Sequence, residues 1–189
     1  MVERVSALAG HNQPGHHGDP DRAGVMLQEM PGLVLHQVAV WQDSIAQVGK
    51  DLAQLVGAGA AAGPGRGVTG TSGSILRIEP MKWWLFGVEA PELDVELGMT
   101  LDLSHSRTHV RVSGDDATAF LNRHFPVDLR EISFPMGGVA ASATHHVGCT
   151  LWRSEHGYEL FMPRGFALSL WEGFVESAAQ FGLEIGATG

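Results

Sequence analysis

The sequence contains a single cysteine, Cys149, so no disulfide can form within the chain. Such sparse use of cysteine fits a reducing compartment, where thiols stay reduced. The sequence also lacks the run of about 20 apolar residues that a membrane-spanning helix needs. Its opening stretch, MVERVSALAGHNQPGHHGDPDRAG, lacks the apolar segment of a secretory signal. We therefore expect a soluble, cytoplasmic protein without a membrane partner.

Basic residues are also scarce, with 12 Lys and Arg against 21 Asp and Glu, a formal net charge of −9. Nucleic-acid-binding proteins carry a basic face, and no Lys/Arg cluster occurs here, so we expect no nucleic-acid partner. One or two arginines nevertheless suffice to bind a small anion. The candidate anion or partner contacts are Arg107, Arg111, Arg153 and Arg164. The alternative is that these arginines form surface ion pairs with the excess of carboxylates.

The composition otherwise suits a compact protein, since 44% of the 189 residues are hydrophobic. Residues 1–24 are rich in Gly, Pro, His and Asp and show no period, which predicts an extended arm that lies on a partner. Residues 25–189 are expected to form one domain. The prediction is thus an arm of residues 1–24 followed by a single domain.

Periodicity and turn residues predict the order of the elements in that domain. Helices are expected at 43–56 and at 166–181. A third helix is expected to begin at a capping box formed by Ser113 and Asp116 and to end at Pro126. Strands are expected at 33–41, 74–79, 82–88, 101–103, 108–113, 139–144, 149–153 and 158–162. The strands at 101–103 and 108–113 would form a hairpin around the sequence SHSR.

Helices in this order alternate with pairs of strands, which favours an α+β fold with largely antiparallel sheets and packed helices. No GxGxxG lies between a strand and a helix, so a Rossmann unit is not expected. The Gly-rich loop 57–73 contains GPGRG and TGTSG but lacks the GKS/T of a phosphate-binding loop. A loop of this length is expected to cover a site or contact a partner.

Five tryptophans are many for a chain of this size, and aromatic residues are enriched at the centres of interfaces. Trp83 and Trp84 are adjacent on a predicted strand, so one should enter the core and the other should face outward. Both are possible partner contacts. One or two of the tryptophans are expected to be exposed in the free chain and buried against a partner.

Three small constellations have both a chemical and a structural interpretation. Asp102 and His105 could form an acid–base pair, or Asp102 could cap the turn SHSR. His145, His146 and Cys149 could suggest a metal site, but adjacent histidines on a strand point to opposite faces and the ligand set is incomplete. Cys149 could be a nucleophile, or a buried inert thiol. We expect no metal and no catalytic residue.

The stretch 101–129, LDLSHSRTHVRVSGDDATAFLNRHFPVDL, resembles the folate-binding domain of the glycine-cleavage T-protein, the aminomethyltransferase fold. The family pattern is a strand ending in D-[LV]-S-H, a return strand, V-x-G, and a helix that begins D-A and contains F-L. The residues that match it are Asp102, Leu103, Ser104, His105, Val112, Gly114, Asp116, Ala117, Phe120 and Leu121. The resemblance implies a T-protein-like α+β fold.

Further segments resemble a narrower family, the γ subunits of heterotetrameric sarcosine oxidase. They are DLSHSRTHVRVSG, FPVDLREISFPMGG, TLWRSEHGYELFMPRGFALSLWEGF and the opening VERVSAL. The resemblance implies a non-catalytic accessory subunit bound directly to a large α subunit, with β and δ subunits in the same complex. It implies that FAD, FMN, NAD and tetrahydrofolate belong to the partner subunits, which oxidatively demethylate N-methyl amino acids such as sarcosine.

The sequence departs from the T-protein pattern after the F-L helix. T-proteins carry a G-G-x-x-D-D-type segment there, whereas Ala141–Arg153, ASATHHVGCTLWR, contains no carboxylate. One-carbon chemistry needs an acidic group to position the amine or pterin nitrogens. Two alternatives to the accessory subunit are a stand-alone folate-binding or one-carbon-transfer protein, and a ligand sensor or repair-type binding protein on the same fold.

Overall fold

The computed structural model describes residues 5–188, which divide into two compact units. Unit 1 consists of the described residues of Met1–Pro31, Ser106–Met136 and Ala141–Gly189. Unit 2 consists of Gly32–His105 and Gly137–Ala140. Unit 2 is therefore inserted in the sequence between segments of unit 1.

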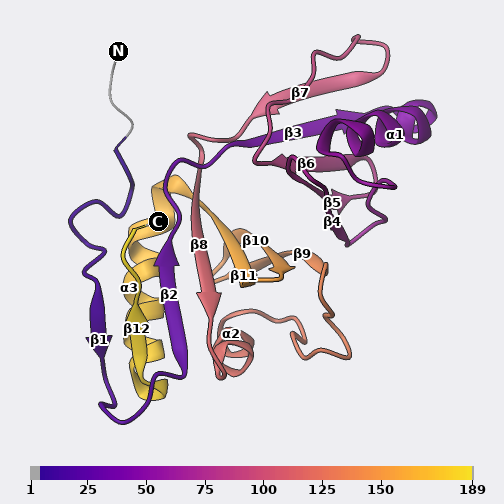
Figure 1. The fold of residues 1–189 in the computed structure, drawn as a ribbon. Coiled ribbons are helices and arrows are strands. Elements are labelled where there is room, and N and C mark those ends of the chain that lie inside the picture. The colour runs from indigo at the N-terminus through magenta and orange to yellow at the C-terminus, as the bar shows by residue number, and fades with distance from the viewer. Residues whose placement is uncertain (1–4, 189) are drawn as a thin grey trace. The chain divides into compact units, whose positions relative to one another are not determined.

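Unit 1 is built on a sheet with the strand order β1-β12-β2-β8-β11-β10-β9 (Figure 1). Its strands are β1 (Gly15–His17), β2 (Val25–Glu29), β8 (Arg107–Ser113), β9 (Val139–Thr144), β10 (Val147–Ser154), β11 (Gly157–Pro163) and β12 (Leu183–Ile185). All neighbours with a described register are antiparallel except β12 and β2, which are parallel. The first two residues of β9 belong to unit 2 and the rest to unit 1.

The helices of unit 1 are α2 (Ala117–His124) and α3 (Ala167–Ala178), with short 3-10 helices at Arg164–Phe166 and Ala179–Phe181. Phe120 of α2 packs against Phe174 of α3 with 5.9 Å between the ring centroids, and against Phe181 at 6.3 Å. These aromatic side chains are buried, so they join the two helices through a shared apolar core.

Unit 2 contains a sheet with the order β4-β5-β6-β3-β7. Its strands are β3 (Leu35–Val40), β4 (Gly67–Thr69), β5 (Ser74–Glu79), β6 (Lys82–Phe86) and β7 (Gly98–Asp102). A 3-10 helix at Gln42–Ser44 leads into the single α-helix of unit 2, α1 (Ile45–Val56). The strand predicted at 33–41, the helix predicted at 43–56, and the strands at 74–79 and 82–88 are thereby confirmed within a few residues.

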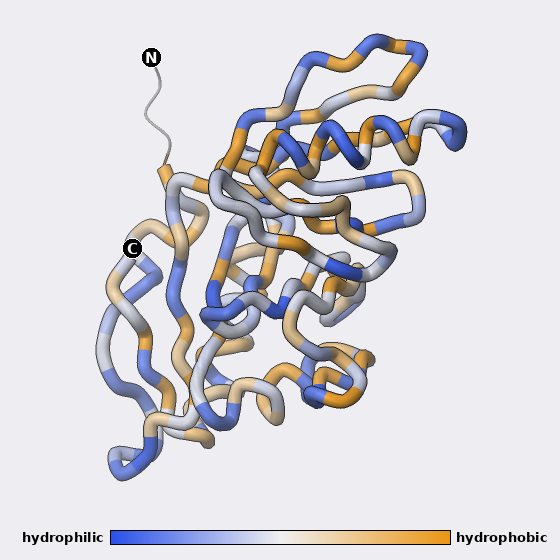
Figure 2. Tube along the Cα trace, turned by 45° about the vertical axis from the view of Figure 1, so that its right-hand side comes forward, coloured by the Kyte–Doolittle hydropathy of each residue, from blue (hydrophilic) through white to orange (hydrophobic). Residues whose placement is uncertain are grey.

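Helix α1 shows why periodicity predicted this part of the fold well. Apolar and polar residues alternate along it with helical spacing, as the colours of Figure 2 show. Its buried residues Val48, Leu52 and Val56 pack with Val38 and Trp83 of the sheet. Gly57 ends the helix with a φ of 74°, a left-handed conformation that glycine adopts without steric cost.

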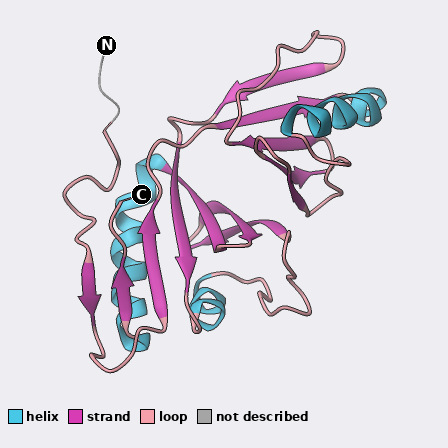
Figure 3. Ribbon diagram, in the orientation of Figure 1, coloured by secondary structure: helices cyan, strands magenta, loops and turns pink. Residues whose placement is uncertain are grey.

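Strands and a few helices mix along the chain, and the sheets are mainly antiparallel (Figure 3). The predicted α+β class is confirmed. Within the described residues, no helix is both long enough and apolar enough to cross a membrane.

The predicted hairpin of 101–103 with 108–113 is wrong. β7 pairs with β3 in unit 2, whereas β8 pairs with β2 and β11 in unit 1. The boundary between the units lies between His105 and Ser106, so the turn passes the chain from one sheet to the other. A turn-forming sequence between two strands fits a hairpin and a crossing equally well, and the strand partners decide between them.

The predicted capping box is also wrong. Ser113 is the last residue of β8, and Asp116 stands at the N-cap of α2 without a side-chain capping bond. Its carboxylate instead pairs with Arg22, whose Nη2 lies 2.5 Å from Oδ2. Helix α2 therefore begins at Ala117, later than a capping box with Ser113 as N-cap would place it, and Asp116 makes a tertiary contact instead of a cap.

The arm of residues 1–24 is part of unit 1 throughout its described length. Leu8 is fully buried, and Gly15–His17 pair with Leu183–Ile185 as strand β1. Arg164 donates a hydrogen bond to the carbonyl of Val5. Residues 1–4 of the predicted arm lie outside the described residues. The boundary at residue 24 and the single domain of 25–189 stay predictions, and the structure adds that the arm completes a sheet.

Replacing Gly182 with alanine is expected to lower the free energy of unfolding by at least about 1–3 kcal/mol, the typical strain of a non-glycine residue in this region. Gly182 has a φ of 69°, and an added Cβ would lie 1.9 Å from the carbonyl oxygen of Arg22. Urea unfolding would measure the change. Gly173→Ala is the matched control, because a Cβ there meets nothing within 4 Å. Equal stabilities for the two variants would contradict the expectation.

Candidate functional site

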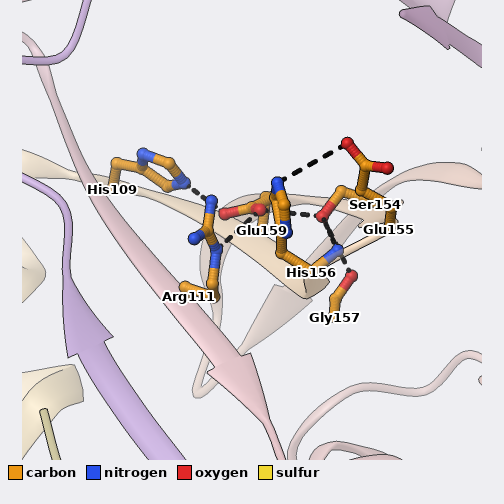
Figure 4. A network of polar contacts seen from close by, with 7 residues as sticks. All are labelled: His109, Arg111, Ser154, Glu155, His156, Gly157 and Glu159. Atoms are coloured by element: carbon orange, nitrogen blue, oxygen red, sulfur yellow. Dashed lines mark hydrogen bonds and ion pairs between the residues drawn. The ribbon is translucent and has the colours of Figure 1, made fainter.

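A buried polar network in unit 1 centres on Glu159 of β11 (Figure 4). Glu159 lies directly opposite Arg111 of β8 in the antiparallel register. The Nε2 of His109 lies 2.6 Å from Oε2 of the carboxylate. Arg111 donates from Nε to Oε1 at 2.9 Å, and Ser154 of β10 donates from Oγ to the same oxygen at 2.8 Å. The network thus connects three neighbouring strands.

Burial of the network decides its electrostatics. Glu159 is 1% exposed and His109 is 3% exposed. Burial alone would raise the pKa of Glu159, but the hydrogen bonds from His109 and Ser154 and the charge of Arg111 outweigh it and lower the pKa below its ordinary value. The carboxylate is therefore ionised in the folded protein at neutral pH.

The chemistry open to this network is limited by its own contacts. Both carboxylate oxygens of Glu159 accept hydrogen bonds from within the chain, and the ring of His109 stacks on Phe161 at 4.8 Å between centroids. A group that reacts with substrate needs an accessible face. With 1% exposure, Glu159 offers no such face to an amine or pterin. The arrangement positions three strands and fixes their register.

Sequence reasoning missed Glu159 although a signal was present. The residue interrupts the apolar run Tyr158–Met162, and charged residues are almost never fully buried unless they are paired. Its partners were visible as the alternation of His109 and Arg111 with Val110 and Val112. A carboxylate and two basic residues inside predicted strands could have been combined into a buried cross-strand pair.

The structure does not gather the four candidate arginines into one anion site. Arg111 faces Glu159, whereas Arg153 pairs in register with Tyr158 and so points to the opposite face of the sheet. Arg153 donates to the carbonyl of Phe134 at 2.8 Å and pairs with Glu131 at 2.7 Å. These contacts favour the alternative of ion pairing within the chain.

Arg107 begins β8 and Arg164 follows β11, and these two strand ends lie side by side. The backbone N–H of Arg164 donates a hydrogen bond to the carbonyl of Ser106 at 2.9 Å. Arg107 is half-buried and donates to the carbonyl of Ser106, and burial lowers its pKa from the ordinary value. Arg164 begins a 3-10 helix of three residues rather than a long helix. A role for the arginines in binding an anion or a partner stays a prediction.

The expectation that Trp83 or Trp84 faces outward is wrong, because they are 1% and 3% exposed. Strand β6 has both faces covered, so alternation sends each indole into a buried layer. Their part in a partner interface stays a prediction that this burial does not favour. Trp41, at the end of β3, is instead exposed to 59%, which fulfils the expectation of an exposed tryptophan.

The smaller constellations have structural roles. The Oδ1 of Asp102 accepts the backbone N–H of Ser104 at 2.8 Å, which is the predicted turn cap. His145 and His146 form the β9–β10 turn with φ values of 46° and 66°, so the argument that strand neighbours point to opposite faces does not apply to them. Cys149 is 4% exposed, and burial raises its pKa to about 11, as expected of an inert thiol. Residues 5–188 contain no group of three or more potential metal ligands.

No family model matches the sequence. A curated protein named sarcosine oxidase subunit gamma, from an Arthrobacter species, is 30% identical over 122 residues. The matched segment is 64% of this chain and 60% of that protein, so it spans less than two thirds of the relative. This relative carries the name of the same family that the sequence motifs resemble.

Solved structures show the same relationship at the level of fold. A chain of the heterotetrameric sarcosine oxidase from Corynebacterium sp. U-96, in complex with pyrrole 2-carboxylate, aligns with a TM-score of 0.77 at 22% identity. The alignment covers 94% of this chain and 96% of that one. The aminomethyltransferase T of the glycine cleavage system from Bartonella henselae aligns with a TM-score of 0.57 at 14% identity, over 87% of this chain and 48% of that one. The chain therefore has the T-protein-like α+β fold, and its predicted resemblance to the sarcosine oxidase γ subunit is confirmed.

Proposed function

We propose that this chain is the accessory γ-type subunit of a heteromeric, sarcosine-oxidase-like flavoenzyme complex. The observation that carries the proposal is the alignment with one chain of heterotetrameric sarcosine oxidase over nearly the full length of both chains. The curated relative named as a γ subunit supports it independently of the fold. In this proposal the complex oxidatively demethylates N-methyl amino acids in the cytoplasm.

The chain contributes structure rather than reacting groups to this complex. A large α subunit contacts it directly, and β and δ subunits complete the assembly. FAD, FMN, NAD and tetrahydrofolate belong to the partner subunits. The buried carboxylate of this chain supports that division, because Glu159 is bonded internally through both oxygens and does not fit a pterin site.

A stand-alone folate-binding or one-carbon-transfer protein is the second candidate, since the aminomethyltransferase T has the same fold. Against it stands the coverage of 48% of that enzyme, which leaves about half of it without a counterpart here. Ala141–Arg153 also contains no carboxylate.

Purification of the tagged chain from its native host tests the proposal. We expect larger subunits to co-elute in a fixed ratio, together with the visible absorbance of bound flavin and the oxidation of an N-methyl amino acid. A colourless chain that elutes alone would contradict the accessory role. Titration calorimetry with tetrahydrofolate then tests the second candidate, for which heat of binding to the isolated chain is the expected result.

A further inference from the structure

Strand β7 is an open edge of the sheet in unit 2, since among residues 5–188 it has a strand neighbour only on its β3 side (Figure 1). Backbone bonds from Leu103 to Leu35 at 2.8 Å and from Trp41 to Leu97 at 3.2 Å bracket the β3–β7 ladder. In an antiparallel pair, alternate residues direct their N–H and C=O toward the neighbour. The backbone groups of Thr100 and Asp102 are therefore directed away from β3, toward the open edge.

This edge carries large apolar side chains and few of the usual protections. Met99 is 66% exposed and Leu101 is 55% exposed. Proteins usually protect such edges with proline, lysine, bulges or very short strands. β7 has five residues, no proline and no lysine, whereas the other edge strand of this sheet, β4, has three residues. An open edge with exposed apolar residues is the form that accepts an added strand.

Apolar surface continues beside the edge. Trp41 is 59% exposed and its Nε1 donates to the carbonyl of Val95 at 2.9 Å, which fixes the indole against the loop that precedes β7. Val95 itself is 76% exposed. Rigid, exposed aromatic groups of this kind are common anchors at the centres of protein interfaces.

The charge around the edge selects the occupant. Between Trp83 and Ser106 the sequence has no lysine or arginine. The same stretch contains five exposed carboxylates: Glu89, Glu92, Asp94, Glu96 and Asp102. Pairing of β7 with β7 of a second copy would bring these like charges together, which is destabilising. An extended segment that carries lysine or arginine complements them.

We propose that the β7 edge is the docking site for an extended, Lys/Arg-bearing strand of a larger partner protein. The strand adds to the sheet through the backbone groups of Thr100 and Asp102, and its apolar side chains cover Met99, Leu101 and Trp41. The inference rests on the proposed function, because the larger subunits of the oxidase complex supply that strand.

Hydrogen exchange followed by mass spectrometry, on the free chain and on the complex isolated from the native host, tests the docking site directly. We expect the amides of Thr100 and Asp102 to exchange at least about tenfold more slowly in the complex, because each gains a hydrogen-bond partner. If the complex forms and these amides exchange at equal rates in both samples, the docking site is wrong while the accessory role stands. If no complex forms, both proposals fail.

Variants test the backbone and charge arguments separately. Thr100→Pro removes a donor that faces the open edge and leaves the bonds to β3 intact, since proline is tolerated on edge strands in that position. We expect it to weaken the complex at least about tenfold. Met99→Lys should weaken it more than Met99→Glu, and added salt should weaken the wild-type complex. Leu55→Lys, on the exposed side of α1, is the control that should leave affinity unchanged.

Three results would overturn the proposal. A homodimer that protects the same amides would assign the edge to a second copy. Unchanged affinity of a folded Thr100→Pro variant would exclude strand addition. A complex that tolerates Met99→Lys better than Met99→Glu, without a dependence on salt, would exclude a basic occupant.

Discussion

Replacing Glu159 with glutamine is expected to lower the free energy of unfolding by about 3–5 kcal/mol, the usual cost of breaking a buried ion pair. The carboxylate accepts bonds from His109, Arg111 and Ser154, and its removal leaves buried donors without their charged partner. Urea unfolding at neutral pH measures the effect. Glu155→Gln is the matched control, because its side chain is 72% exposed in its pair with His156. A Glu159→Gln variant as stable as this control would contradict the structural role.

The same network gives the protein a dependence on acid. The pKa of Glu159 is lower in the folded state than in the unfolded chain, despite the opposing effect of burial. Its stabilising contribution is therefore complete above the unfolded pKa of about 4.3 and is lost as the pH falls through the folded pKa. Ser154→Ala is a second variant for the case in which Glu159→Gln does not fold. It is expected to lower the free energy of unfolding by about 1 kcal/mol.

Removal of residues 1–24 is expected to unfold or strongly destabilise unit 1. Leu8 is fully buried, and deletion also removes β1 from the sheet edge beside β12. Leu8→Ala alone should lower the free energy of unfolding by about 2–5 kcal/mol, as for other large-to-small changes in a core. The expected contact of residues 1–24 with a partner stays a prediction, and these contacts add a role for the arm within unit 1.

Circular dichroism and urea unfolding of the truncated chain measure this effect. Val5→Ala is the control for Leu8→Ala, because Val5 is 58% exposed and exposed changes usually stay within about 0.5 kcal/mol. A truncated chain with the wild-type unfolding midpoint would show that the packing of Leu8 and β1 adds nothing to the stability of unit 1.

The sequence predicted the elements whose pattern is local. Helix α1 follows from the spacing of Val48, Leu52 and Val56, and strand β3 from a short run that is apolar except for His36 and Gln37. Strand β1 could not be predicted, since its three residues, Gly-His-His, have no pattern and become a strand only through pairing with β12. The false hairpin at SHSR has the same origin, because the partners of β7 and β8 lie far away in the sequence.

The polar network was missed, and the exposure of Trp83 or Trp84 was predicted wrongly, for a related reason. The sequence contained Glu159, His109 and Arg111, but their contact depends on the register of β8 against β11, which single-strand patterns do not fix. Alternation correctly placed Trp83 and Trp84 on opposite faces and wrongly assumed that one face is open. The family resemblance was more reliable, because it rested on motif residues spread over several segments rather than on the environment of single side chains.

The insertion of unit 2 into unit 1 also sets the order in which the chain can fold during synthesis. Residues 32–105 of unit 2 are consecutive and contain every strand of its sheet, so this sheet can pair before most of unit 1 has been made. The sheet of unit 1 needs β12 at Leu183–Ile185 to join β1 to β2, so this part of the sheet stays open until residues 183–185 have been made. The side of β2 that pairs with β12 therefore stays open while the preceding chain is made, which makes chaperones or an already folded partner subunit important to the yield of the protein.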